Sequence, residues 1–359
     1  MIMKKVVLLA PTPPPAGGIA GWTARMLKAN LKNGWKVEVV DEKCIGNREV
    51  FGKSGKRHLT EEIKRSFFIW KGLRAKLNDS SVAVVQSCIP AYTLSMAREY
   101  VCACITRINR RKFILHFRCT VPNAVNSRLQ RFILKKICHM SDYVFVLNEQ
   151  SKVFIEKLTN TPVRLVPNFV SEDEIVEPRH IHEELKRIVY VGGLVENKGI
   201  REILDIAERL PNLQFVFVGK GDKIFEDEAK IRNLSNTLFI GGKDHAGVKD
   251  ELINADAFIF LTRFRGEGFS NSLCEAMAAG LPCIVTDWAA NRDMIGDSGG
   301  IVVSAGNVND AVSAIESIRD MDIRRKMSIN NIYKVKSEYI ESVVVDKMVD
   351  IYESLLQGD

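Results

Sequence analysis

Short apolar runs recur along the chain and alternate with longer stretches in which apolar and polar residues mix. In the first half, each run is nearly continuously apolar, which is typical of strands buried on both faces of a parallel sheet. Between the first two runs, residues 19–33 suit a helix that ends at Asn33-Gly34. The strands predicted in this half span residues 4–9, 37–40, 82–85, 113–116, 143–147 and 163–166.

The same alternation starts again after Pro167-Asn168, where an acidic and irregular stretch follows over 171–177. We therefore place a domain boundary here, with one domain over 1–168 and a second over 169–339. Alternating strands and helices predict parallel sheets, so we expect an α/β protein with two Rossmann-like domains facing across a cleft. Ligands of such sheets bind outside the carboxyl ends of the strands. The strands predicted in the second domain span 188–193, 215–218, 238–240, 258–260 and 283–286.

The most informative segment of the chain, residues 266–282, follows the apolar run 257–261. Gly266 and Gly268 allow a sharp turn that leaves backbone amides uncovered. Helix-forming residues start at Ser272, so the segment predicts a strand, a turn and then a helix whose N-terminus points at the turn. Free N–H groups and the helix dipole make such an N-terminus an anion site.

Two carboxylates, Glu267 and Glu275, lie eight residues apart in this segment. Ser272 and Glu275 have the spacing of a capping box, with Ser272 at the N-cap and Glu275 at N3. Taken alone, Glu275 is therefore better explained by capping than by ligand binding. Glu267 lies between two glycines in an exposed turn, where packing gives no reason for a carboxylate.

The run from Glu267 to Pro282 resembles the E-x7-E signature of the family-four retaining glycosyltransferases of the GT-B fold, also called glycosyl transferases group 1. The resemblance implies that Glu267 lies near the ring of the donor sugar and that Glu275 binds the ribose hydroxyls of a nucleoside diphosphate. It also implies that the backbone amides between them hold sugar hydroxyls and the β-phosphate. These amides belong to Gly268, Phe269, Ser270, Asn271, Ser272 and Leu273.

A second element, residues 192–199, also follows a strand and precedes a helix. Its Lys198 can place a point charge against a phosphate, although a lysine at a helix start is more often simply solvated. The element resembles the G-R-x4-K-G element of the same family, with Gly193 at the position of the family arginine. The resemblance therefore implies a donor site that includes Gly193 and Lys198. Our hypothesis is that Arg263 or Arg265, just before the Glu267 turn, replaces the missing cation.

Two features of the first domain also match the family. Gly17-Gly18 follows the first strand and resembles the family's glycine loop, whose amides approach the donor phosphates. By itself it is a glycine-rich turn and lacks the dinucleotide fingerprint. His116 ends a predicted strand, where a core histidine is about as expected as a functional one. The resemblance implies that His116 lies near the reacting sugar.

Charge divides the chain unevenly. Residues 1–170 carry a net charge of +18 and residues 171–359 a net charge of −11, within a total of +7. The basic segments 64–74 and 128–136 mix Lys and Arg with large apolar side chains at helical spacing. We expect them to be attracted to an anionic membrane surface. Ordinary core helices with a solvated face explain each segment alone, and no nucleic-acid recognition motif accompanies them.

The location expected from the sequence is the cytoplasm, at the inner face of the membrane as a peripheral protein. No run approaches the roughly 20 apolar residues that span a bilayer, and the chain enters its first strand without a cleavable signal. The eight cysteines form no paired CxxC motifs, so we expect reduced and mostly buried thiols.

The resemblance as a whole implies a retaining, metal-independent hexosyltransferase without a cofactor. The second domain would bind a nucleoside-diphosphate sugar, with UDP expected from its frequency in the family. The first domain would bind a saccharide or lipid-linked saccharide acceptor, and the last helix, in 340–359, would cross back to it. Glu267, Lys198 and His116 are the implied catalytic residues. The form of the motif at 266–272 resembles bacterial polysaccharide-assembly transferases, which implies a role in cell-surface polysaccharide such as lipopolysaccharide.

Two alternatives stay open. The first is a nucleotide-sugar epimerase on the same fold, which would turn over the donor without any acceptor. The second is a non-catalytic protein that binds sugar nucleotides, for which the missing arginine at Gly193 is the only hint.

Overall fold

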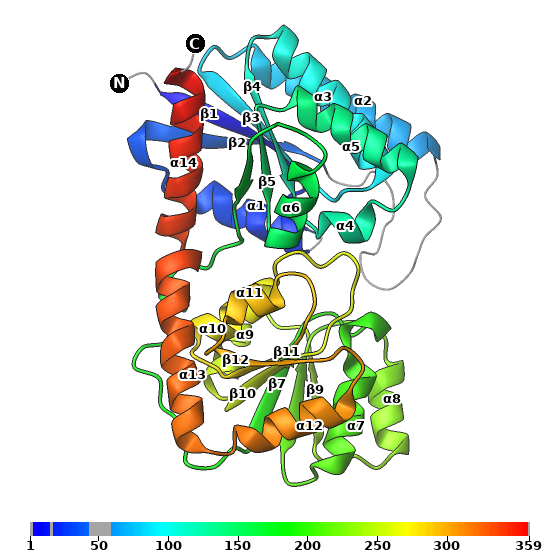
Figure 1. The fold of residues 1–359 in the computed structure, drawn as a ribbon, viewed down its shortest axis with the longest axis vertical. Helices are drawn as coiled ribbons and strands as arrows, with labels where there is room; N and C mark the ends of the chain where they lie inside the picture. Colours follow the sequence, from blue (N-terminus) through cyan, green and yellow to red (C-terminus); the bar gives the residue numbers. More distant parts are fainter. Residues whose placement is uncertain (1–2, 15–16, 43–58, 358–359) are drawn as a thin grey trace. The chain divides into compact units, whose positions relative to one another are not determined.

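The computed structural model describes residues 3–14, 17–42 and 59–357. The chain divides into two compact units, each built on its own parallel sheet of six strands (Figure 1). The first unit comprises residues 1–168 and 342–359, and the second comprises the residues in between. Both units are α/β, as the alternation of strands and helices predicts.

The first unit contains all six strands predicted for it. These are β1 (Lys4–Ala10), β2 (Trp35–Asp41), β3 (Val82–Ile89), β4 (Lys112–Phe117), β5 (Tyr143–Val146) and β6 (Val163–Leu165). They are parallel and lie in the order β2-β1-β3-β4-β5-β6. Its helices are α1 (Gly18–Lys28), α2 (Leu59–Leu77), α3 (Thr93–Ile108), α4 (Val121–Ala124), α5 (Arg128–Met140), α6 (Glu149–Glu156) and α14 (Glu341–Gln357). The predicted helix 19–33 ends early, because the backbone is extended at Ala29 before a short 3-10 turn, η1 (Lys32–Gly34).

The second unit repeats the plan. Its strands are β7 (Arg187–Val191), β8 (Gln214–Val218), β9 (Thr237–Gly241), β10 (Ala257–Phe260), β11 (Cys283–Thr286) and β12 (Gly300–Val303), in the order β12-β11-β10-β7-β8-β9. Its α-helices are α7 (Ile200–Arg209), α8 (Ile224–Ile231), α9 (His245–Ile253), α10 (Asn271–Ala278), α11 (Asn291–Ile295), α12 (Val308–Ser317) and α13 (Met321–Lys334). Its short turns are η2 (Glu172–Glu174), η3 (Glu196–Lys198) and the π-helical η4 (Val335–Tyr339).

One strand of the second unit, β12, was not predicted. It lies at the edge of the sheet and starts at Gly300, whose Cβ, if present, would lie 1.9 Å from the carbonyl oxygen of Cys283 in β11. The close approach of the two strands therefore depends on a glycine, and a glycine at the start of a short run weakens the apolar pattern of a strand.

Helices α2, α3 and α5 lie together in the first unit (Figure 1). The middle helix, α3, packs against both neighbours. Buried side chains from all three join one core with residues of the sheet, among them Leu73, Cys102 and Leu134. Seven cysteines lie in the described part of the chain, six of them buried and none in a disulfide, as the sequence predicts.

The last helix, α14, packs on the first unit. The Tyr352 hydroxyl donates to Gln86 Oε1 at 2.5 Å, and Trp35 Nε1 donates to Glu353 Oε1 at 2.7 Å. Among the helices that the structure describes, none is both long and apolar enough to cross a membrane.

A buried ionic cluster lies after the end of β2, near β3. The Arg98 guanidinium donates to Glu42 Oε2 at 2.8 Å and to Glu99 Oε1 at 2.5 Å. Burial, followed by repulsion from Glu99, raises the pKa of Glu42 to about 8. The folded state therefore keeps a proton that the unfolded state has already released, so this carboxyl destabilises the fold as the pH rises from 4.5 toward 8.

The strand order identifies where a ligand is expected. It reverses between β7 and β10 in the second sheet, and between β1 and β3 in the first. In doubly wound sheets, ligands bind outside the carboxyl ends of the strands at such a switch point. The chain leaves β7 into residues 192–199 and leaves β10 into residues 261–270, so the two segments singled out by the sequence meet at one switch point.

Candidate functional site

Lys198 and Glu267 are in direct contact at the switch point of the second sheet. The Lys198 ammonium donates to Glu267 Oε2, and the two side chains are 16% and 12% exposed. The ammonium also lies 5.2 Å from the ring centroid of Phe260 and 5.1 Å from that of Phe264. Aromatic faces attract a cation and shield it from water, so the charge of Lys198 acts here with little screening.

Gly199 allows the loop after β7 to lie against the end of β10. Its φ is +80°, and a Cβ atom there would lie 2.4 Å from the carbonyl oxygen of Leu261. The backbone N–H of Arg263 donates to the carbonyl of Asn197 at 2.8 Å. Any larger residue at Gly199 would push the two loops apart, and with them Lys198 and Glu267.

The loop that carries Glu267 is fixed by backbone and side-chain contacts. The backbone N–H of Glu267 donates to the carbonyl of Phe264 at 3.0 Å, and Trp288 Nε1 donates to the same carbonyl at 2.8 Å. Downstream, the rings of Phe269 and Tyr339 lie edge to face, 5.1 Å between centroids. These contacts hold the carboxylate on a rigid turn rather than on a loose loop.

The start of α10 corrects the predicted capping box. The N-cap is Ser270, whose hydroxyl accepts the N–H of Leu273 at 3.3 Å, and Ser272 is the second residue of the helix. The predicted cap at Ser272 with Glu275 at N3 is therefore wrong. The backbone is extended at Ser270 and already helical at the next residue, which leaves Glu275 a full turn inside α10. Capping no longer accounts for Glu275.

Glu275 lies near two side chains that the sequence analysis missed. The potential ligand atoms of Glu174, His245 and Glu275 all lie within 4.8 Å of one another. An imidazole with two carboxylates is also a donor set that suits a divalent transition metal. No local pattern points to this group, because the three residues come from η2, α9 and α10.

Two arginines stand between β10 and the Glu267 turn, and their environments differ. Arg263 forms an ion pair with Glu202 of α7. Arg265 is exposed, and no hydrogen bond or ion pair joins its side chain to another residue of the described chain. Of the two cations that could replace the missing arginine at Gly193, Arg265 is the one that a ligand can recruit without breaking an ion pair.

Gly193 itself lies beside a buried tyrosine. The Tyr190 hydroxyl donates to the carbonyl of Gly193 at 2.9 Å. Burial, with a smaller contribution from the charge of Glu267, holds the pKa of Tyr190 well above its usual value. Tyr190 therefore stays neutral and supplies no charge of its own next to Lys198 and Glu267.

In the first unit, Gly17 and Gly18 form the start of α1. Gly17 is the N-cap, with no side-chain cap, and the first turn of α1 contains no acidic residue. A Cβ atom built on either glycine has no neighbour within 4 Å among the described residues. Both glycines are exposed, and their contact with a donor phosphate stays a prediction.

His116 is buried in the first unit. Its ring lies edge to face against Trp22 and Phe145, with centroids 5.5 Å away in each case. Nδ1 lies 3.1 Å from Gln86 Nε2, and Nε2 lies 3.1 Å from Arg118 Nη1. A guanidinium only donates and carries a positive charge, so the contact with Arg118 disfavours the protonated imidazole. Burial, then the charge of Arg118, keeps the pKa of His116 well below its usual value.

These contacts give His116 the environment of a core histidine, with no exposed surface. A contact with a sugar stays a prediction for this residue. Its neighbour Arg118 was not singled out by the sequence: the guanidinium stacks 4.3 Å from the Trp22 ring centroid and donates to Asn168. Burial lowers the pKa of Arg118 to about 10.

Helices α2 and α5 each expose large apolar side chains beside basic ones, and we call the exposed surfaces of these two helices together the basic helical face. On α2, Phe67 and Phe68 are 63% and 60% exposed; on α5, Leu129 and Phe132 are 62% and 59% exposed. No acidic residue occurs in α5, and none occurs in α2 after Glu62. The exposed cations of this face are Lys64, Lys71, Arg74, Arg128, Arg131, Lys135 and Lys136.

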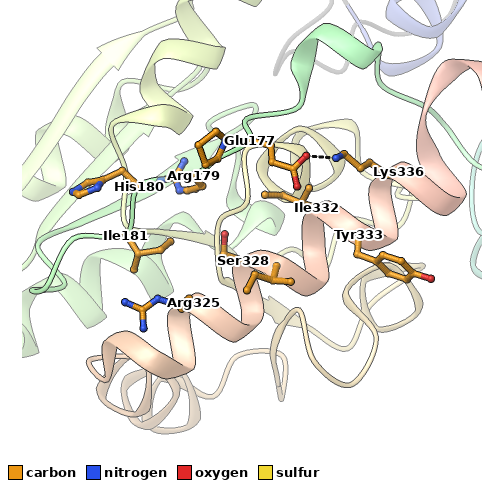
Figure 2. Close-up of a pocket in the computed structure, with 11 residues that line it drawn as sticks. Glu177, Arg179, His180, Ile181, Arg325, Ser328, Ile332, Tyr333 and Lys336 are labelled. Carbon is orange, nitrogen blue, oxygen red and sulfur yellow. Dashed lines mark hydrogen bonds and ion pairs between the residues drawn. The ribbon is translucent and has the colours of Figure 1, made fainter.

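A separate cavity of about 650 Å³ opens on the second unit between residues 177–181 and α13 (Figure 2). At its rim, Lys336 pairs with Glu177. The Arg179 guanidinium is directed into the protein, where it donates to the carbonyls of Leu252 at 3.2 Å and Ala279 at 2.8 Å. None of the site residues expected from the sequence lines this cavity, so we do not assign it to the site.

The chain is similar to known glycosyltransferases. The family described as Glycosyl transferases group 1 matches residues 171–335. The phosphatidyl-myo-inositol mannosyltransferase of Mycobacterium leprae is 28% identical over 204 residues, which are 53% of this chain and 53% of that enzyme. The chain thus spans about half the length of that relative. The N-acetyl-alpha-D-glucosaminyl L-malate synthase of Bacillus anthracis is 22% identical over 382 residues, 90% of this chain and 98% of that enzyme.

Solved structures match the whole chain. The sucrose-phosphate synthase of Thermosynechococcus elongatus superposes with a TM-score of 0.79 at 16% identity, over 99% of this chain and 100% of that one. The Anabaena protein HepE in complex with UDP superposes with a TM-score of 0.73 at 13% identity, over 98% and 100%. These likenesses establish the fold: the chain has the two-unit GT-B architecture that its sequence resembles.

Proposed function

From the premise that this chain carries a Glycosyl transferases group 1 domain over residues 171–335, we propose that it is a retaining hexosyltransferase. The donor is a nucleoside-diphosphate sugar, most simply a UDP-sugar, and the acceptor is a saccharide or lipid-linked saccharide. The product belongs to a cell-surface polysaccharide such as lipopolysaccharide. HepE, which has the same fold, is described in complex with UDP, and this supports the choice of nucleotide.

The observation that carries the proposal is the contact between Lys198 and Glu267 at the switch point. Transfer of a sugar from a nucleoside diphosphate builds negative charge on the departing diphosphate, and a fixed cation lowers that barrier. Lys198 is the cation, and without a donor its charge is neutralised by Glu267. When a donor binds, Lys198 pairs with the diphosphate instead of Glu267, and Glu267 orients the sugar ring.

The remaining donor contacts follow from the helix start and the two loops. In this proposal the positive end of the α10 dipole and the amides of its first two residues, Asn271 and Ser272, bind the diphosphate, while the Leu273 amide stays with the Ser270 cap. Arg265 supplies the second cation in place of the arginine missing at Gly193, and Glu275 binds the ribose. With these groups in place the reaction needs no metal ion. The Gly17-Gly18 amides add donors from the first unit.

The acceptor side rests on the first unit. One relative is named for a phosphatidyl-myo-inositol acceptor, which supports a lipid-linked acceptor for this chain. The basic helical face pairs exposed phenylalanines with cations, the combination that binds an anionic membrane by charge and by burial of apolar rings. We place the protein in the cytoplasm, peripheral to the inner membrane face.

The test of the function is donor turnover with and without an acceptor. Purified protein is incubated with UDP-hexoses, and UDP release and hexose isomers are measured in the presence and absence of lipid extract from the source cells. A transferase releases UDP only when acceptor is present and labels the acceptor with retention of the anomeric configuration. Conversion of the hexose without acceptor would favour the epimerase, and binding without turnover would favour a non-catalytic protein.

The membrane contact has its own test. Co-sedimentation with vesicles of phosphatidylcholine containing anionic phosphatidylglycerol should decrease when Phe67 and Phe132 are both changed to Ser, and when salt is raised. The matched control is Ile231→Ser, which removes an apolar side chain of 80% exposure from the second unit. Equal sedimentation of both variants and wild type would exclude the basic helical face.

A further inference from the structure

The group around Glu275 carries an inference beyond the assignment of Glu275 to the ribose. Glu174, His245 and Glu275 come from three elements of the second unit, and their potential ligand atoms lie within 4.8 Å of one another. We propose that His245, aligned by Glu174, is a positioning residue for Glu275 and sets the selectivity of the site for the nucleotide ribose. The proposal rests on the proposed function, in which Glu275 is the ribose ligand.

Glu174 is a fixed acceptor. Its side chain is 8% exposed, and its Oε1 accepts the backbone N–H of Ser171 at 2.9 Å in the capping box of η2. His245 Nε2 lies 3.3 Å from the same oxygen. A buried carboxylate that is already tied to the backbone does not move with the imidazole, so it determines where the ring points.

His245 lies where a nucleoside is expected. It is the first residue of α9, and the cap of that helix is fixed because Asp244 Oδ1 accepts the N–H of Gly247 at 2.9 Å. The loop before it starts at Gly241, the carboxyl end of β9. β9 is the edge strand of the sheet, and His245 comes near the switch point because its imidazole lies within 4.8 Å of the carboxylate of Glu275, on the helix that follows β10. The His245 side chain is 56% exposed and is therefore accessible to a ligand.

The charges in the group explain why an imidazole is needed. Two carboxylates at this separation repel each other, and an imidazole that donates to either one relieves the repulsion. Lys249 also lines the cavity between these residues, but its ammonium donates to the carbonyl of Asp173 rather than to either carboxylate. His245 is thus the side chain that can keep Glu275 apart from Glu174 and turned toward a ribose.

The space inside the group is small. A cavity of about 10 Å³ is lined by the three residues together with Val248 and Leu252, which is about the volume that one water molecule needs. A ribose cannot enter this space and must approach from the exposed side of His245. A metal ion is small enough to enter, so a metal site is the competing outcome that the experiment has to separate.

The experiment measures ribose selectivity directly. Dissociation constants of UDP and 2′-deoxy-UDP are measured by calorimetry in EDTA for wild type, His245→Ala, His245→Gln and the control His180→Ala, an exposed histidine of the cavity in Figure 2. Wild type should prefer UDP roughly tenfold, the value of one hydrogen bond to a charged group. His245→Ala should reduce that preference to about twofold, whereas His245→Gln, which keeps a donor, and the control should retain most of it.

If His245 has only a structural role, its loss would weaken the binding of both nucleotides equally and leave the ratio of their dissociation constants unchanged. That result would overturn the proposal. So would stabilisation by Zn²⁺ alone that requires His245, with an unchanged ratio in EDTA, because it would identify a metal site. If wild type binds neither nucleotide, the proposed function fails and the ribose proposal falls with it. That outcome is distinct, since it appears before any variant is made.

Discussion

The contact between Lys198 and Glu267 predicts that substitutions of the two residues affect stability and activity differently. In Lys198→Met the ammonium is lost but an unbranched apolar side chain is kept near Phe260 and Phe264. Glu267, 12% exposed, is left without the ammonium that neutralises it. Removing one partner costs 3–5 kcal/mol in a buried pair and about 0–1 kcal/mol at the surface. For a pair this far from solvent we expect a loss of about 2 kcal/mol in the free energy of unfolding.

Adding a second substitution, Glu267→Gln, distinguishes the loss of stability in Lys198→Met from the loss of activity. In the double variant no unneutralised carboxylate remains, so most of the lost stability should return, and denaturant unfolding measures this. Activity should not return. The cation that faces the departing diphosphate is still missing, and loss of one preorganised group of this kind lowers kcat by about 10²- to 10³-fold. Donor turnover in the presence of acceptor measures the second effect.

The reasoning is refuted if Lys198→Met keeps kcat within about threefold of wild type, a difference too small for a lost transition-state contact. It is also refuted if the double variant recovers activity together with stability. Either result would make the contact a structural ion pair and would remove the observation on which the proposed function depends.

Three further predictions follow from the same contacts. Arg265→Ala should raise KM for the donor about tenfold, as expected for a lost charged hydrogen bond, while Arg263→Ala, which breaks an ion pair outside the proposed phosphate contacts, should change KM little. Gly199→Ala should lower both stability and kcat, because φ there is +80° and Leu261 leaves no room for a methyl group; an unchanged melting temperature would contradict this. Glu42→Gln should abolish the loss of stability between about pH 5 and 8 that the raised pKa of Glu42 produces in wild type, and unfolding curves that run parallel at all pH values would refute it.

Most of the fold was predictable because the central strands of both sheets are buried on both faces. The apolar run 82–85 identifies a strand without any knowledge of its neighbours, and so does the alternation of such runs with helical stretches. The strand β12 was missed because its first residue, Gly300, has to be a glycine where the strand packs closely against Cys283. This constraint comes from the neighbouring strand, so the local sequence pattern does not contain it.

The parts of the candidate site that lie within a single continuous segment were predictable. Residues 192–199 and 266–282 were found by their glycines and charges, and the structure brings Lys198 and Glu267 into contact. The N-cap of α10 was misassigned because Ser270 and Ser272 are both good caps, and only the backbone conformation decides between them.

What the sequence could not predict comes from distant segments. Glu174 and His245 reach Glu275 from separate elements, and each is an ordinary surface-type residue in its own stretch. The burial of His116 between Trp22 and Phe145 depends on how α1 and β5 pack against β4. Such neighbourhoods are set by the tertiary fold, so a one-dimensional pattern carries no signal for them.

The most direct test of the central claim is a thermal-shift panel of UDP, GDP, ADP, CMP and dTDP on wild type and Glu275→Ala. A ligand that binds only the folded state stabilises it by about 2.7 kcal/mol at a hundredfold excess over its dissociation constant. The proposal predicts that one nucleoside diphosphate, UDP, raises the melting temperature of wild type and that Glu275→Ala loses this shift. If none of the nucleotides stabilises wild type, or if the variant keeps the full shift, the switch point of the second sheet is not the nucleotide-sugar site that we propose.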